Sequence, residues 1–175
     1  ERCEALLEWA RRQAAWIIED DYDSEFRYAG RPVVSLQHLD RHSRVIYIGT
    51  FAKTMFPSLR TGFLVVPEEI AKDLAIMVHL GGQEPAVHLQ AALADFIAKG
   101  HYAVHIQKTR SIYRRRQDLL VGTLNKHLDG IVSLSPPPGG VSLVLTLPPD
   151  IRALAVQALA AEEGLHARAV SYYAL

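Results

Sequence analysis

Apolar residues form two kinds of pattern along this chain, short continuous runs and longer stretches with helical spacing. The short runs predict three strands, over residues 15–19, 44–51 (RVIYIGTF) and 61–67 (TGFLVVP). The apolar triplet at residues 16–18 and the nearly unbroken second run suggest strands that are buried on both faces. Because only about a dozen residues, interrupted by Pro57, separate the second and third strands, a crossover helix between parallel neighbours barely fits. The third strand is therefore expected to be antiparallel or distant.

Helical spacing of apolar residues predicts four helices in the first three quarters of the chain. These cover CEALLEWARRQ (residues 3–13), 67–79, 86–99 and 100–127. Pro67 followed by two glutamates suits the start of the second helix, and Gly81 and Gly82 suit its end. The fourth is long enough to connect two lobes.

The character of the chain changes at Gly130. The segment IVSLSPPPGGVSLVLTLPP is rich in β-forming residues, and Asp150 is predicted to cap a helix over IRALAVQALAAEEG. Residues 20–43 are predicted to be irregular. The alternation of strands and helices indicates an α/β fold. We expect three parts: residues 1–100, part of a large domain; 101–128, a long connecting helix; and 129–175, a small α/β lobe.

Composition narrows the class of protein. The chain has 175 residues, 49% of them hydrophobic and 22% charged, and its 19 basic and 19 acidic residues cancel. A net charge of zero gives no electrostatic drive toward nucleic acid. The single cysteine, Cys3, excludes an internal disulfide framework and fits a reducing compartment, so we expect a cytoplasmic protein.

No apolar run suits a membrane span or a secretion signal, and no metal site is predicted. His101 and His105 lie four residues apart, but no third ligand is evident.

Charge gathers where the first predicted strand ends, in WIIEDDYDSEFRY (residues 16–28). Like charges repel, so these acids predict a positive group nearby. The second strand ends in YIGTFAKTMFPSLR, which carries Thr50, Lys53 and Arg60. The carboxyl ends of sheet strands are where open α/β folds bind ligands. Taken alone, each residue suits an ordinary surface, but the joint pattern indicates a site.

The second set suits a phosphorylated aldehyde. Arg60 can hold phosphate with two hydrogen bonds, Thr50 can add another, and Lys53 can form a Schiff base. An acid beneath a pyridine nitrogen keeps that nitrogen protonated, which makes the ring of pyridoxal 5'-phosphate (PLP) an electron sink. Asp20 would supply this acid.

At these residues the chain resembles a known family. IIEDDYDSEFRY and YIGTFAKTMFPSLRTGFLVVP are similar to the aminotransferase-like domain of MocR-type regulators of the GntR family, within the fold-type I PLP superfamily. The likeness continues through GHYAVHIQKTRSIYRRRQDLL and GGVSLVL to SYY, and so covers essentially the whole chain. It implies a partial fold-type I transferase, a remnant of the large-domain sheet joined by a long helix to a small lobe.

The resemblance also implies roles for single residues. Lys53 would be the Schiff-base lysine, Asp20 the partner of the pyridine nitrogen, and Tyr22 a donor to the 3-oxygen of the ring. Thr50 and Arg60 would hold the phosphate. No ligand role follows for Asp21, Asp23 or Glu25. Ala52 departs from the serine expected beside the lysine, which weakens the detail of the phosphate site.

The family implies further parts and partners. Relatives carry a winged-helix domain that binds DNA and an earlier part of the large domain, so the chain, which opens without Met inside a helix, is interpreted as a C-terminal fragment. PLP binding to this fragment would be weak or absent. The arginine that grips a substrate carboxylate is expected beyond Leu175, since Arg168 is a poor substitute. A homodimer is implied.

The resulting hypothesis is an effector-sensing domain that binds PLP at Lys53 and responds to an amino acid or amine, regulatory rather than catalytic. One alternative is a working PLP-dependent aminotransferase. A second is a dimerisation lobe without cofactor.

Overall fold

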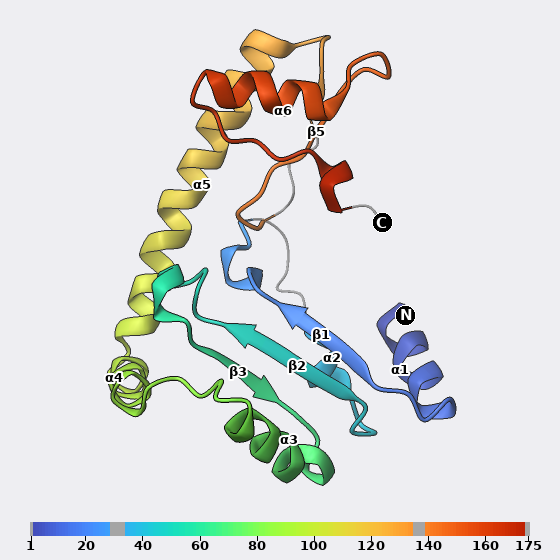
Figure 1. Ribbon diagram of the computed structural model, residues 1–175, viewed down its shortest axis with the longest axis vertical. Helices are drawn as coiled ribbons and strands as arrows, with labels where there is room; N and C mark the ends of the chain where they lie inside the picture. The colour runs from blue at the N-terminus through green and yellow to red at the C-terminus, as the bar shows by residue number, and fades with distance from the viewer. Residues whose placement is uncertain (1, 29–33, 135–138, 174–175) are drawn as a thin grey trace. The chain divides into compact units, whose positions relative to one another are not determined.

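The computed structural model describes residues 2–28, 34–134 and 139–173 (Figure 1). Its elements in chain order are α1 (Arg2–Arg12), β1 (Ile17–Asp21), η1 (Ser24–Phe26), α2 (Leu36–Leu39), β2 (Val45–Thr50), η2 (Pro57–Leu59), β3 (Gly62–Val65), α3 (Glu68–Leu80), α4 (Val87–Ala98), α5 (His101–Leu128), β4 (Ser133–Leu134), β5 (Leu145–Thr146), α6 (Ala153–Glu162) and η3 (Val170–Tyr173). The predicted α/β class is confirmed.

Two compact units divide the chain. The first is Glu1–Tyr113 with Pro138–Val141, and the second is Arg114–Pro137 with Ser142–Leu175. The helix predicted from residue 100 onward is α5, which contributes to both units. The proposed division at residues 100 and 128 stays a prediction. In the part of the chain that the structure describes, no helix is long and apolar enough to cross a membrane.

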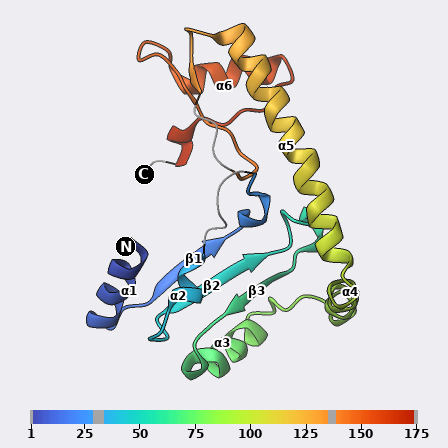
Figure 2. The ribbon, with the colours of Figure 1, turned by 180° about the vertical axis from the view of Figure 1, so that it is seen from behind.

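The first unit contains a three-stranded sheet in the order β1–β2–β3 (Figures 1 and 2). β1 and β2 are parallel, with Asp20 beside Ile48. β3 runs antiparallel to β2, with Gly62 beside Thr50. Of the two expectations for β3, the antiparallel neighbour is the one observed, as the short connection after β2 favours.

Gly49 lets an aromatic ring lie against β2. A Cβ atom at this position would lie 2.3 Å from the Phe63 ring of the neighbouring strand. The same ring is 5.5 Å from the Phe51 ring and 6.0 Å from that of Tyr47, measured between centroids. These contacts join β2 and β3 beside the connection that follows β2.

The predicted burial of residues 16–18 is wrong. Trp16 is 38% exposed and Ile18 is 66% exposed. β1 is one of the two edge strands of the described sheet, and the Arg44 guanidinium lies 5.2 Å from the centroid of the Trp16 ring. The buried apolar residues of the first unit come from the helices, the other strands and the turns: Leu7, Ala10, Phe26, Val45, Leu59 and Ile106.

A short helix, α2, lies in the stretch that was predicted to be irregular. Ser35 caps it by accepting a hydrogen bond from the backbone N–H of His38. The Glu19 carboxylate of β1 accepts two more, from the N–H groups of Leu36 (2.8 Å) and Gln37 (2.9 Å). A negative group is favourable at a helix N-terminus, so Glu19 helps to define where α2 begins.

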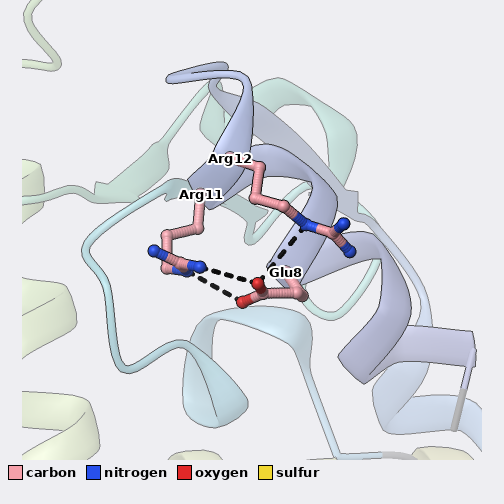
Figure 3. Close-up of polar contacts among 3 residues, drawn as sticks. All are labelled: Glu8, Arg11 and Arg12. Atoms are coloured by element: carbon pink, nitrogen blue, oxygen red, sulfur yellow. Dashed lines mark hydrogen bonds and ion pairs between the residues drawn. The ribbon is translucent and has the colours of Figure 1, made fainter.

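The end of α1 carries an exposed ion-pair cluster (Figure 3). Glu8 accepts two hydrogen bonds from Arg11, at 2.8 and 2.7 Å, and its carboxylate lies 3.4 Å from Arg12. The hydrogen bonds from Arg11 lower the pKa of Glu8 to about 2. Because these side chains are exposed to water, the cluster contributes little to stability.

The second unit contains the C-terminal part of α5, α6, η3 and a two-stranded antiparallel ribbon of β4 and β5. The prediction that Asp150 caps the last helix is wrong, because α6 starts at Ala153 and its N-cap residue is Arg152. The backbone N–H of Ile151 instead closes a turn onto the Pro148 carbonyl, at 3.0 Å. The Gln157 side chain then accepts from the N–H of Ala169, at 2.7 Å, and ties α6 to the segment after it.

Candidate functional site

The acids at the end of β1 have different structural roles. Asp21 accepts hydrogen bonds from the Tyr47 hydroxyl (2.7 Å) and from the Ser24 hydroxyl (2.6 Å). Asp23 accepts one from the backbone N–H of Val141, at 3.3 Å. Burial, and then the bond to Asp21, raise the pKa of the Tyr47 phenol, so it stays a donor at neutral pH. Asp21 and Asp23 therefore hold the fold together at the end of β1.

Glu25 lies in the turn after β1 and is half-buried. Burial raises the pKa of its carboxyl, and the nearby charges of Asp21 and Asp23 raise it further. Its backbone carbonyl accepts a hydrogen bond from the Arg110 side chain of α5, at 2.7 Å. This segment is thereby fixed to α5.

Asp20 differs from its acidic neighbours. It lies on β1 between Glu19 and Asp21 and is exposed. Within the described ranges, no donor or cation bonds to its carboxylate, whereas Glu19, Asp21 and Asp23 all accept hydrogen bonds. Folding leaves this charge available to a ligand.

Lys53 lies in a single helical turn directly after β2. The turn is closed by a hydrogen bond from the Met55 N–H to the Phe51 carbonyl, at 2.8 Å. It begins at Thr50, whose hydroxyl accepts from the N–H of Ala52, at 3.1 Å. Thr54 is only 1% exposed, whereas Lys53 is exposed. The backbone of the turn is thus anchored while the amine faces water.

Arg60 is presented in a similar way. Its backbone has φ 50° and ψ 34°, in the left-handed region that residues other than glycine rarely adopt. Its two neighbours, Leu59 and Thr61, are buried, and the Thr61 hydroxyl donates to the Leu59 carbonyl at 2.9 Å. The exposed guanidinium therefore projects from a firmly held backbone. Strain of this kind often accompanies function.

The topology brings the predicted site residues to one end of the sheet, where β1 and β2 both have their carboxyl ends. The parallel pairing of β1 and β2 places the carboxyl ends of both strands, and hence Asp20, Tyr22 and Thr50, along the same edge. The antiparallel pairing of β2 and β3 returns Arg60 to the end of β2, since the N–H of Phe51 bonds to the Thr61 carbonyl at 3.0 Å. All of these residues belong to the first compact unit.

The donor set fits PLP. In the described part of the chain, no hydrogen bond or ion pair occupies the side chains of Asp20, Lys53 or Arg60. Two cations, one carboxylate and the exposed phenol of Tyr22 match a ligand that combines a phosphate, an aldehyde, a ring hydroxyl and a pyridine nitrogen. The role of each residue toward PLP stays a prediction.

The sequence did not reveal which residues of α5 support the helical turn that carries Lys53 (residues 51–55, below called the lysine turn). The ring nitrogen Nε2 of His105 lies 2.8 Å from the Thr54 carbonyl oxygen, and the Tyr102 ring lies 5.7 Å from that of Phe51. These residues are about fifty positions from the turn along the chain, so no local pattern joins them to Lys53. His101, which was weighed with His105 as a zinc pair, lies against the Phe96 ring at 5.5 Å.

This fold is that of the fold-type I PLP-dependent aminotransferases. The crystal structure of Pyrococcus horikoshii kynurenine aminotransferase, in complex with PMP, superposes with a TM-score of 0.86 and 30% identity. The match covers 94% of this chain and 41% of that chain. The sequence matches the family "Aminotransferase class I and II" over residues 1–175, and the chain belongs to that family.

Curated relatives include transcriptional regulators. The probable rhizopine catabolism regulatory protein MocR of Rhizobium meliloti is 48% identical over 139 residues, which are 79% of this chain and 28% of that protein. The HTH-type pyridoxine biosynthesis transcriptional regulator PdxR of Corynebacterium glutamicum is 35% identical over 175 residues, 99% of this chain and 37% of that protein. The resemblance to the aminotransferase-like domain of such regulators is confirmed. The chain spans roughly a third of the length of these relatives.

Proposed function

We propose that this chain is the PLP-binding, effector-sensing part of a bacterial transcriptional regulator of the MocR type. The observation that carries the proposal is the set of unpaired charges of Asp20, Lys53 and Arg60 at one sheet edge, in a chain whose relatives include HTH-type regulators. When bound, PLP supplies an aldehyde that primary amines capture and a ring that accepts negative charge.

Each residue of the site has a task in this proposal. Lys53 supplies the amine for covalent attachment, and Asp20 holds a proton on the ring nitrogen through its negative charge. Arg60 donates two hydrogen bonds to the phosphate, and the Thr50 hydroxyl donates another. The Tyr22 hydroxyl would donate a hydrogen bond to the ring 3-oxygen. Anchored backbone on both sides of Lys53 and Arg60 holds these groups in place before the cofactor arrives.

The regulatory step depends on release of the lysine. An amino acid or amine effector would take the place of the Lys53 amine, which would then be free at the sheet edge. A ligand shifts a conformational equilibrium only by its different affinities for the two states, so the freed lysine provides one such difference. DNA would be bound in the cytoplasm by a winged-helix domain elsewhere in the homodimeric full-length protein.

A second function has its own support. The solved structure with TM-score 0.86 is an aminotransferase, and Lys53 and Asp20 of this chain would serve such catalysis equally well. Transamination requires repeated release of a 2-oxo acid, whereas a sensor needs only binding. The two functions are therefore distinguished by turnover.

The experiment measures binding of the full-length protein to the DNA upstream of its own gene. PLP is added alone and then with each standard amino acid in turn, and 2-oxo acids are assayed in the same mixtures. We expect PLP, or PLP with one of the amino acids, to change DNA affinity about tenfold in the wild type and in Lys72→Ala, but not in Lys53→Ala. Equal responses of the wild type and Lys53→Ala would refute the proposal, and catalytic formation of 2-oxo acid would favour the enzyme.

A further inference from the structure

The turn that carries Lys53 is held by side chains of α5 at both of its ends. We infer that His105 is a positioning residue for Lys53, which it serves by fixing the carbonyl of the next residue, Thr54. This inference deepens the proposed function and rests on it for the role of the lysine. No role in the site was predicted from the sequence for His105 or for Thr54.

The first support is the hydrogen bond itself. His105 Nε2 lies 2.8 Å from the Thr54 carbonyl oxygen, and a carbonyl oxygen can only accept. Nε2 therefore carries the proton and donates it. The hydroxyl of Thr109, one helical turn further along α5, lies 3.4 Å from the same nitrogen. His105 is half-buried and Thr54 is almost completely buried, so water competes poorly for this bond.

The second support is at the other end of the turn. The Tyr102 ring meets the Phe51 ring edge-on, with centroids 5.7 Å apart, and the Phe51 backbone N–H is bonded to the Thr61 carbonyl. Tyr102 and His105 are three residues apart and therefore lie on one face of α5. Ile106 next to them is 7% exposed and holds this part of the helix in the core.

Lys53 lies between these two anchors and is itself exposed. Fixing the backbone on both sides restricts the volume that the amine explores before it meets an aldehyde. Preorganisation of this kind favours attachment because less conformational entropy is lost when the bond forms. Without the donor at residue 105, the Thr54 carbonyl loses the tertiary hydrogen bond that it accepts, and only the bond between the Tyr102 and Thr54 side chains still ties Thr54 to α5 in the described part of the chain.

The test uses the full-length protein and three substitutions. His105→Leu removes the donor at similar size, and His105→Gln keeps an N–H at a similar reach. His101→Leu is the matched control one turn earlier, where the histidine is exposed and contacts Phe96. Two quantities are measured for each: amide hydrogen exchange of residues 51–55 without cofactor, and the dissociation constant for PLP followed by absorbance.

We expect His105→Leu to speed exchange in the turn and to weaken PLP binding, each about five- to tenfold, as loss of one hydrogen bond predicts. His105→Gln should restore most of both, and His101→Leu should match the wild type. If His105→Leu fails to fold, His105→Asn, which is polar but too short to reach Thr54, takes its place. Exchange and binding in these variants that equal those of His101→Leu would overturn the inference. Failure of the wild type to attach PLP at Lys53 would instead overturn the proposed function, and the exchange data would still decide whether His105 holds the turn.

Discussion

At the scale of single residues, the acidic segment after β1 separates into groups that build the fold and one that does not. Glu19 caps α2, Asp21 holds Tyr47 and Ser24, and Asp23 binds the N–H of Val141. Asp20 has no such partner within the described ranges. A charge that the fold does not use is the one we assign to the cofactor.

Replacing Asp20 should separate binding from stability. In the full-length protein, we expect Asp20→Asn to weaken PLP binding at least tenfold, since the negative charge that would keep the ring nitrogen protonated is lost. Its free energy of unfolding should stay within about 0.5 kcal/mol of the wild type, because no described contact is removed. PLP titration and urea denaturation measure the two effects.

Asp21→Asn is the matched control, one residue further along β1. It weakens the acceptor of the Tyr47 and Ser24 hydroxyls and should cost about 1–2 kcal/mol of stability. Its effect on PLP binding should be small. If Asp20→Asn proved the less stable of the two, Asp20 would be structural and its assignment would be wrong.

Arg60 offers a test in which stability and binding move in opposite directions. Its left-handed backbone costs about 1 kcal/mol for a side-chain-bearing residue, and glycine avoids most of that cost. We expect Arg60→Gly to unfold at equal or slightly higher urea concentration while binding PLP much more weakly. Arg60→Lys, which keeps the charge without the two-pronged donor, should bind with intermediate affinity. Unchanged PLP affinity in Arg60→Gly would remove Arg60 from the site.

At the scale of elements, the site depends on two connections of the sheet. The turn after β1 is tied to α5, and the connection between β2 and β3 carries both Lys53 and Arg60. The antiparallel return of β3 is what places Arg60 near Thr50, although they are ten positions apart in the sequence. A parallel third strand would send Arg60 away from this edge.

The entry into β2 gives a prediction with a pH dependence. Burial raises the pKa of Asp40, but hydrogen bonds from the N–H groups of His42, Arg44 and Val45 outweigh it, so the pKa lies below the ordinary 3.8. A lowered folded-state pKa stabilises the protein above pH 3.8, and this stability is lost as the pH falls through the folded-state pKa.

We therefore expect Asp40→Asn to cost about 1–2 kcal/mol at pH 7 in the full-length protein, a difference that shrinks in acid. Urea denaturation from pH 7 to pH 3 measures it. Asp73→Asn, an exposed carboxylate on α3, is the control and should show no comparable loss. A cost that is independent of pH would contradict the assigned cause.

Local patterns predicted the elements well, and distant contacts explain what they missed. The strands and α5 follow from continuous apolar runs and helical spacing, which are properties of neighbouring residues. α2 depends on Glu19 of β1, and the support of the lysine turn depends on His105 of α5. The residues of the candidate site were predicted from their order along the chain together with a family resemblance. The α5 residues that support them, such as His105, leave no comparable pattern in the sequence.

At the scale of the whole molecule, much apolar surface is uncovered in this chain. All four residues of β3 are exposed, and Met77 and Leu80 of α3 are among the most exposed large apolar side chains. Exposed apolar surface of this kind promotes association. The chain spans 28% and 37% of the two regulators it was compared with.

We accordingly expect the 175-residue chain alone to self-associate and to bind PLP at least about a hundredfold more weakly than the full-length protein. In the proposed full-length protein, further residues would add to the side chains described above, and three or four such contacts would account for this factor. Sedimentation and PLP titration measure both properties. A monomer that binds PLP as tightly as the full-length protein would contradict the expectation.

In the proposed function, Lys53 is the residue that binds PLP. Borohydride reduction of the full-length protein with bound PLP makes the attachment permanent, and peptide mapping by mass spectrometry then locates it. We expect the label on Lys53, in the peptide that contains Thr50 and Thr54, and no label at this peptide in Lys53→Ala. A label on Lys72 or Lys99 in the wild type, with Lys53 unmodified, would contradict it.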